Sequence, residues 1–134
     1  MTRSGRTKRV SALEARQYLA KAEEFLAVAE DCVAAGYHIA ATGNAVHAAV
    51  NASDAVCGVR TGHRSAGQNH DETLDLLREA GKDGVELAKH LSRLLPLKTR
   101  AEYEPDDVPK GVASKAVESA RKAVTVARRV VLPG

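Results

Sequence analysis

The chain has 134 residues, 44% of them hydrophobic, which is enough for one domain with its own core. The formal net charge of +3 permits contact with nucleic acid without requiring it, and the scarcity of aromatic residues, 3% with no Trp, excludes a core built from large side chains. No stretch has the length and hydrophobicity of a membrane-spanning helix or of the apolar part of an export signal, so the sequence predicts a cytoplasmic protein without a membrane partner. Cys32 and Cys57 stand apart from each other, which favours reduced thiols over a disulfide or a zinc site.

Residues 1–10 are basic and have no apolar pattern. Arg3, Arg6, Lys8 and Arg9 alternate there with Ser, Gly and Thr. We therefore expect a flexible basic tail over residues 1–10, followed by a single domain over residues 11–134.

The first two predicted helices have clear boundaries. Ser11 and Glu14 form a capping-box pattern and Gly36 supplies a stop, which predicts a helix over residues 12–35. After a connection of two residues, an antiparallel helix is predicted over residues 38–59. Residues 40–55 carry almost no charge, and a helix of this kind is stable in water only when other helices surround it. We expect it to be the central helix of the domain.

The second half of the chain predicts shorter elements. Asn69 is a candidate N-cap for a helix from His70 to Gly81. A capping pattern at Asp83 suggests another short helix that stops before Pro96. Residues 96–111 hold three prolines and many charges and predict a non-helical strap, and residues 109–131 predict a last helix. Together these elements predict an all-α helical bundle.

A polar stripe runs along the second helix at spacings of three, four and three residues. Its members are Asn44, His47, Asn51 and Asp54. Buried polar groups need partners, which here are Arg60, Arg64 or His70, a second subunit, or a bound ligand. Hydrogen bonding is a better explanation than metal binding, because no pair such as Glu-x-x-His accompanies His47 and Asp54. We predict neither a metal nor a cofactor.

Arg64 and His70 are the candidate catalytic pair. Arg64 lies in a glycine-containing loop, and His70 lies at the expected start of a helix. Arginine can hold two phosphate oxygens in a fork, and a helix N-terminus binds anions and disfavours a charged imidazole. With RNA, His70 could take the 2′-hydroxyl proton while Arg64 stabilises the charge on phosphorus. The alternative is structural, with Arg64 bridging helix ends and His70 in a capping turn.

Three segments resemble the HEPN domains (higher eukaryotes and prokaryotes nucleotide-binding). They are residues 25–37, with Phe25, Glu30 and Tyr37; the Arg64-x5-His70 pair; and residues 98–105 followed by Ala116-x-x-Ser-Ala-Arg121. The resemblance covers most of residues 12–130. It implies an all-α, up-and-down bundle of four to five helices that is often dimeric, in a family that contains metal-independent RNases with an Arg-x4-6-His motif as well as inactive members. By position, Arg64 and His70 match that motif.

Two hypotheses about function follow. The first is a HEPN-type metal-independent endoribonuclease, a toxin or defence effector, with Arg64 on the scissile phosphate and His70 as base. Further phosphate contacts would come from Arg60, Lys98, Arg100 and Tyr103. The second is a non-catalytic HEPN-like module that binds a nucleotide or a cognate partner protein as a homodimer, with the polar stripe at the dimer interface. Enzymatic activity stays open between the two.

Overall fold

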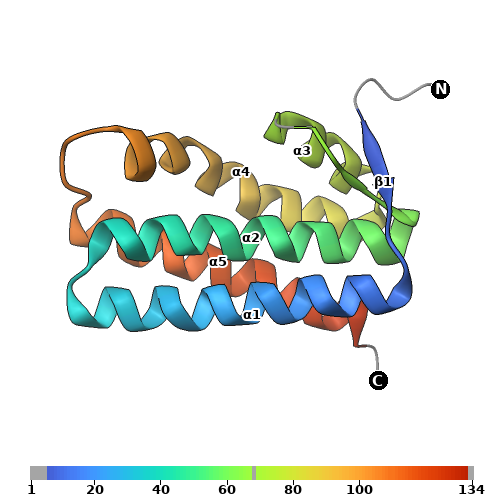
Figure 1. Cartoon of the computed structure of the whole chain (residues 1–134), viewed down its shortest axis with the longest axis horizontal. Coiled ribbons are helices and arrows are strands. Elements are labelled where there is room, and N and C mark those ends of the chain that lie inside the picture. The colour runs from blue at the N-terminus through green and yellow to red at the C-terminus, as the bar shows by residue number, and fades with distance from the viewer. Residues whose placement is uncertain (1–5, 68, 133–134) are drawn as a thin grey trace.

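Five helices form a bundle, and two short strands lie at one end of it (Figure 1). The computed structural model describes residues 6–67 and 69–132. Its helices are α1 (Ala12–Ala35), α2 (His38–Thr61), α3 (His70–Arg78), α4 (Gly81–Tyr103) and α5 (Lys110–Val131), and its strands are β1 (Thr7–Arg9) and β2 (His63–Ser65). The predicted all-α bundle of four to five helices is confirmed. None of the helices in the described residues is long and apolar enough to cross a membrane.

α1 has the boundaries that its capping residues predict. The Ser11 hydroxyl accepts a hydrogen bond from the Glu14 amide at 3.1 Å, and the Glu14 carboxylate accepts one from the Ser11 amide at 2.9 Å. At the other end Gly36 has φ +85°, a left-handed conformation in which glycine carries no steric penalty. The turn is so short that α2 must run back antiparallel along α1, as Figure 1 shows.

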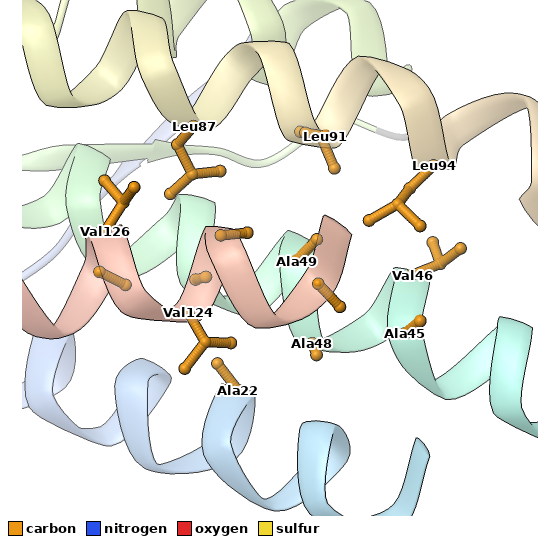
Figure 2. Packing of buried hydrophobic residues seen from close by; sticks show 14 of the residues in the cluster. Ala22, Ala45, Val46, Ala48, Ala49, Leu87, Leu91, Leu94, Val124 and Val126 are labelled. Atoms are coloured by element: carbon orange, nitrogen blue, oxygen red, sulfur yellow. The ribbon is translucent and has the colours of Figure 1, made fainter. Parts of the chain in front are cut away.

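α2 is the central helix, packed against α1, α4 and α5. Its inward positions are mostly alanine, and Ala45, Ala48 and Ala49 are fully buried. Small side chains let the helices approach closely, and leucines and valines of the neighbours fill the space between them. Figure 2 shows Leu94 of α4 directed toward α2, and Val124 of α5 directed toward Ala22 of α1.

The junction of α3 and α4 differs from the prediction. α3 ends at Arg78, and Gly81, with φ +80°, begins α4 instead of ending α3. The capping pattern at Asp83 therefore lies inside a helix. Gly84 explains the tight junction, because a Cβ atom there would lie 2.0 Å from the Leu77 carbonyl oxygen of α3.

The prediction that Pro96 stops a helix is wrong, because α4 continues through it to Tyr103. Proline lacks an N–H group and normally weakens a helix interior. Here the helix has apolar anchors on both sides: Leu94 is fully buried, and Leu97 packs against the core. The non-helical connection is thus confined to residues 104–109, and residues 98–103 stand on a helix.

The basic N-terminal segment is ordered where the structure describes it, contrary to a flexible tail over residues 1–10. β1 pairs antiparallel with β2 in the register Thr7 to Ser65, Lys8 to Arg64 and Arg9 to His63. The Ala66 amide donates to the Arg6 carbonyl at 2.9 Å, the Val10 amide donates to the Gly62 carbonyl at 2.9 Å, and Val10 is buried against Gly58 of α2. Residues 1–5 lie outside the described residues.

Candidate functional site

The two candidate catalytic residues lie in different elements. Arg64 is the middle residue of β2, and His70 is the first residue of α3. Asn69 is the N-cap of α3, as predicted, because its side-chain oxygen accepts a hydrogen bond from the Asp71 amide at 2.9 Å. His70 therefore has the predicted position at a helix N-terminus.

Arg64 lies against α1. Its guanidinium carbon is 5.6 Å from the centre of the Tyr18 ring, in a cation–π arrangement, and Nη1 donates a hydrogen bond to the Ser65 carbonyl at 2.9 Å. This is the one hydrogen bond from the Arg64 side chain to the described residues. Since a guanidinium has five N–H donors, most of its capacity to bind an anion is unused.

His70 lies beside the last turns of α4. Burial lowers the pKa of His70, and the Lys98 ammonium lowers it further, while Glu102 and Asp71 oppose the shift. No hydrogen bond from a described residue contributes to this shift. A half-buried imidazole of this kind is neutral near pH 7 and can accept a proton. Among the described residues, no hydrogen bond joins His70 to Arg64, although α3 and β2 are in contact.

Helix α4 brings more polar groups to this region. Lys98 Nζ lies 3.6 Å from Glu102 Oε2 and 5.7 Å from the centre of the Tyr103 ring. Glu102 Oε1 lies 3.8 Å from His47 Nε2 on α2. Because Pro96 does not end α4, these groups stand on a helix rather than on a loop. Tyr103 is 71% exposed and free to meet a ligand.

The polar stripe is satisfied mainly within its own helix. Asn44 Nδ2 donates to the Ala40 carbonyl, and Asn51 Nδ2 donates to the His47 carbonyl, both at 2.8 Å. The His47 ring lies 5.2 Å from the Phe25 ring of α1, centre to centre. The two asparagines therefore do not need a second subunit or a ligand, because each bonds back one turn along α2.

Asp54 is the exception in the polar stripe. It is 9% exposed, and burial raises its pKa from 3.8 to about 7, although Arg64 and Lys21 partly oppose this shift. A carboxyl that titrates near neutrality beside a candidate catalytic arginine is a typical feature of functional sites. Its electrostatic partner is Arg64, one of the residues the sequence suggested.

Arg60 and Arg100, two of the predicted phosphate-binding residues, lie in different surroundings. Arg60 is engaged elsewhere: its Nη2 donates to Asp83 Oδ2 at 2.9 Å, and Asp83 also accepts from Arg129. Arg60 is thus part of an ion-pair cluster between α2, α4 and α5 rather than a partner of the polar stripe. Arg100 is half-buried on α4, one turn from Tyr103.

Sequence reasoning missed Tyr18, Lys8 and the environment of His90. Tyr18 fits the apolar pattern of α1, and nothing local marks it as a platform for Arg64. Lys8 lies in the segment that was expected to be flexible. His90 on α4 is 7% exposed, and its Nδ1 has no hydrogen-bond partner among the described residues.

A known protein family matches most of the chain. The model of the HEPN domain matches residues 15–131, which is most of the chain. No curated protein matches this chain. Within residues 6–67 and 69–132, no group of three His, Cys, Asp or Glu side chains is placed to hold a metal ion. The five-helix bundle of the chain agrees with the family match, and the chain belongs to the HEPN domain family.

Proposed function

We propose that this protein is a metal-independent endoribonuclease in which His70 is the general base and Arg64 binds the scissile phosphate. The observation that carries the proposal is the environment of His70. It lies at the start of α3, its pKa is lowered by burial and by Lys98, and no hydrogen bond from a described residue contributes to this shift. A neutral imidazole at a helix N-terminus can accept a proton where the backbone amides favour a bound phosphate.

The proposed reaction needs no component beyond RNA and protein. His70 takes the proton from a ribose 2′-hydroxyl, the 2′-oxygen attacks the adjacent phosphorus, and the 5′-oxygen of the next nucleotide leaves. The products are a 2′,3′-cyclic phosphate and a 5′-hydroxyl after a proton reaches the leaving oxygen. Arg64 offers unused N–H donors to the phosphate oxygens, which gain charge in the transition state. Lys98, Arg100 and Tyr103 would contact the flanking RNA, and Arg60 would do so only by leaving Asp83.

We extend the proposal to a cytoplasmic homodimer that acts as a toxin or defence effector, with a cognate partner protein to restrain it. Dimerisation would supply a second set of cations opposite the first. What supports this extension is the family match, because HEPN domains are often dimeric.

The direct test is incubation of the purified protein with mixed RNA in EDTA. We expect cleavage that leaves 2′,3′-cyclic phosphate ends. Arg64→Ala and His70→Ala should each lower the rate by about a hundredfold or more, and Arg64→Lys should fail too because an ammonium cannot form the fork. The matched control is His63→Ala, because His63 Nδ1 lies 3.1 Å from the Thr61 carbonyl oxygen and is engaged in the turn.

A second function, a non-catalytic binding module, is favoured by a different surface. An open pocket of about 540 Å³ lies at the α1–α2 turn, beside Tyr37, Ile39 and Val108. Tyr37 is 67% exposed and Ile39 is 43% exposed. Neighbouring exposed apolar side chains of this kind are typical of interaction surfaces. If RNA is bound without being cut, or if cleavage survives both alanine substitutions, a HEPN-like module that binds a nucleotide or a partner protein is the better description.

A further inference from the structure

β1 and β2 place two cations directly opposite each other. In the antiparallel register, Lys8 faces Arg64, one residue from each strand. Directly opposed residues project from the same face of a two-stranded ribbon, with Cβ atoms about 4.5–5.5 Å apart. The two side chains are therefore close enough to contact one small anion together.

This pairing is unfavourable without a ligand. Like charges directly opposite each other destabilise a strand pair. Arg64 has Asp54 and Glu14 within electrostatic range, but no described residue forms an ion pair with Lys8, which is exposed. An anion between the two side chains would remove the repulsion and bind both.

The backbone around the pair is held firmly in place. Hydrogen bonds from Ala66 to Arg6 and from Val10 to Gly62 close the ribbon at its two ends. Val10 anchors β1 by packing on Gly58, where an added Cβ would lie 2.5 Å from Val10 Cγ1. Three residues of sheet would be weak alone, so this anchor fixes the register that puts Lys8 opposite Arg64.

We propose that Lys8 and Arg64 form a two-cation phosphate-binding site, with β1 as an integral part of it. Arg64 supplies a planar fork and Lys8 a point charge, a combination that suits a phosphodiester. The inference rests on RNA being the proposed substrate, and it assigns Lys8 to a backbone phosphate of that RNA. Because this contact is to phosphate alone, it adds affinity without a preference for any base.

Alternation along β1 provides a matched control. Arg9 is the next residue, carries the same charge and is also exposed, but it projects from the opposite face of the ribbon, opposite His63. Lys8→Ala and Arg9→Ala therefore remove the same charge from the same strand on different faces. A third variant, Lys8→Glu, places a carboxylate opposite Arg64. This carboxylate should form an ion pair with the Arg64 guanidinium and compete with a phosphate for it.

The experiment measures binding of a short single-stranded RNA in which every 2′-hydroxyl is methylated, so that it keeps its phosphates but has no nucleophile. Anisotropy titrations at several salt concentrations compare the full-length wild-type protein with the three variants. We expect Lys8→Ala to bind roughly fivefold more weakly, with a salt slope about 0.7 less steep, as for the loss of one phosphate contact to a single strand. Lys8→Glu should lose more, and Arg9→Ala should bind like the wild type.

Thermal unfolding separates binding from folding. Without RNA, Lys8→Ala should melt at the same temperature as the wild type or slightly higher, because it removes a repulsive pair. Equal losses of affinity in Lys8→Ala and Arg9→Ala would mean that β1 contributes only general positive charge, and would overturn the proposal. The proposal would also be overturned if neither variant lost affinity, or if the wild type did not bind the RNA.

Cleavage of unmodified RNA in EDTA keeps the two proposals distinguishable. If the methylated RNA binds in a Lys8-dependent manner but unmodified RNA is never cut, the phosphate site stands and the endoribonuclease proposal fails. If RNA is cut at equal rates by Lys8→Ala and Arg9→Ala and both bind equally, the phosphate site fails and the nuclease stands.

Discussion

Asp54 makes the stability of the protein depend on pH in a direction opposite to that of most carboxylates. Burial of the carboxyl raises its pKa from 3.8 to about 7, against the opposing attraction of Arg64 and Lys21. Below pH 3.8 the carboxyl is protonated in both the folded and the unfolded chain. Between pH 3.8 and about 7 the unfolded chain releases this proton while the folded chain keeps it, so stability falls as pH rises. Above pH 7 both states are ionised and the loss is complete.

The substitution Asp54→Asn isolates this effect, because asparagine is nearly the same size and does not titrate. Each pKa unit corresponds to about 1.4 kcal/mol, so the wild type should lose roughly 4 kcal/mol of stability relative to Asp54→Asn between pH 4 and pH 8. Arg64 from β2 and Lys21 from α1 are the charged groups that oppose the shift, and their attraction is already contained in the value of about 7.

The assay is chemical unfolding of both proteins in urea at half-unit steps from pH 4 to 8. The quantity of interest is the difference in unfolding free energy at each pH, in which the contributions of all other titrating groups cancel. Asp31→Asn, which removes an exposed carboxyl from α1, shows whether the trend is specific to the buried group. A difference between wild type and Asp54→Asn that stays constant over this range would refute the argument that Asp54 is protonated in the fold near neutrality.

Two further predictions concern the neighbours of His70 and the glycines of the bundle. Lys98→Gln should raise the pKa of His70 and move the acidic limb of a pH–rate profile to higher pH, whereas Glu102→Gln should move it to lower pH; identical profiles would contradict the proposed base. Gly84→Ala should cost at least about 2 kcal/mol in urea unfolding, because its Cβ would meet a backbone carbonyl at 2.0 Å. Gly43→Ala, with open space around it in α2, should instead stabilise by about 0.5–1 kcal/mol.

The elements that sequence reasoning placed well are those with local signals. Ser11, Glu14 and Gly36 define both ends of α1, and Asn69 defines the start of α3, because capping depends on a few adjacent residues. The near absence of charge in residues 40–55 correctly indicated a central helix. Fold class followed from patterns of this kind, whereas the family was indicated by the resemblance of three segments to HEPN domains.

The errors arise where distant contacts outweigh local preference. Pro96 is a local stop signal, but α4 is held on both sides of it by packing that the sequence does not reveal. β1 depends on a partner strand more than fifty residues away and is too short to show alternation. The asparagines of the polar stripe suggested an external partner because spacing shows which face a residue lies on, not whether its side chain bonds back to its own helix.

Two of the three tyrosines lie beneath cations of the proposed site, Tyr18 under Arg64 and Tyr103 under Lys98, while Tyr37 lies at the α1–α2 turn. The chain has no tryptophan to dominate its emission. A ligand that draws Arg64 or Lys98 off its ring changes the surroundings of that chromophore directly. Tyrosine fluorescence, with Tyr18→Phe and Tyr103→Phe to assign the signal, thus gives this protein an internal optical probe of ligand binding that needs no label.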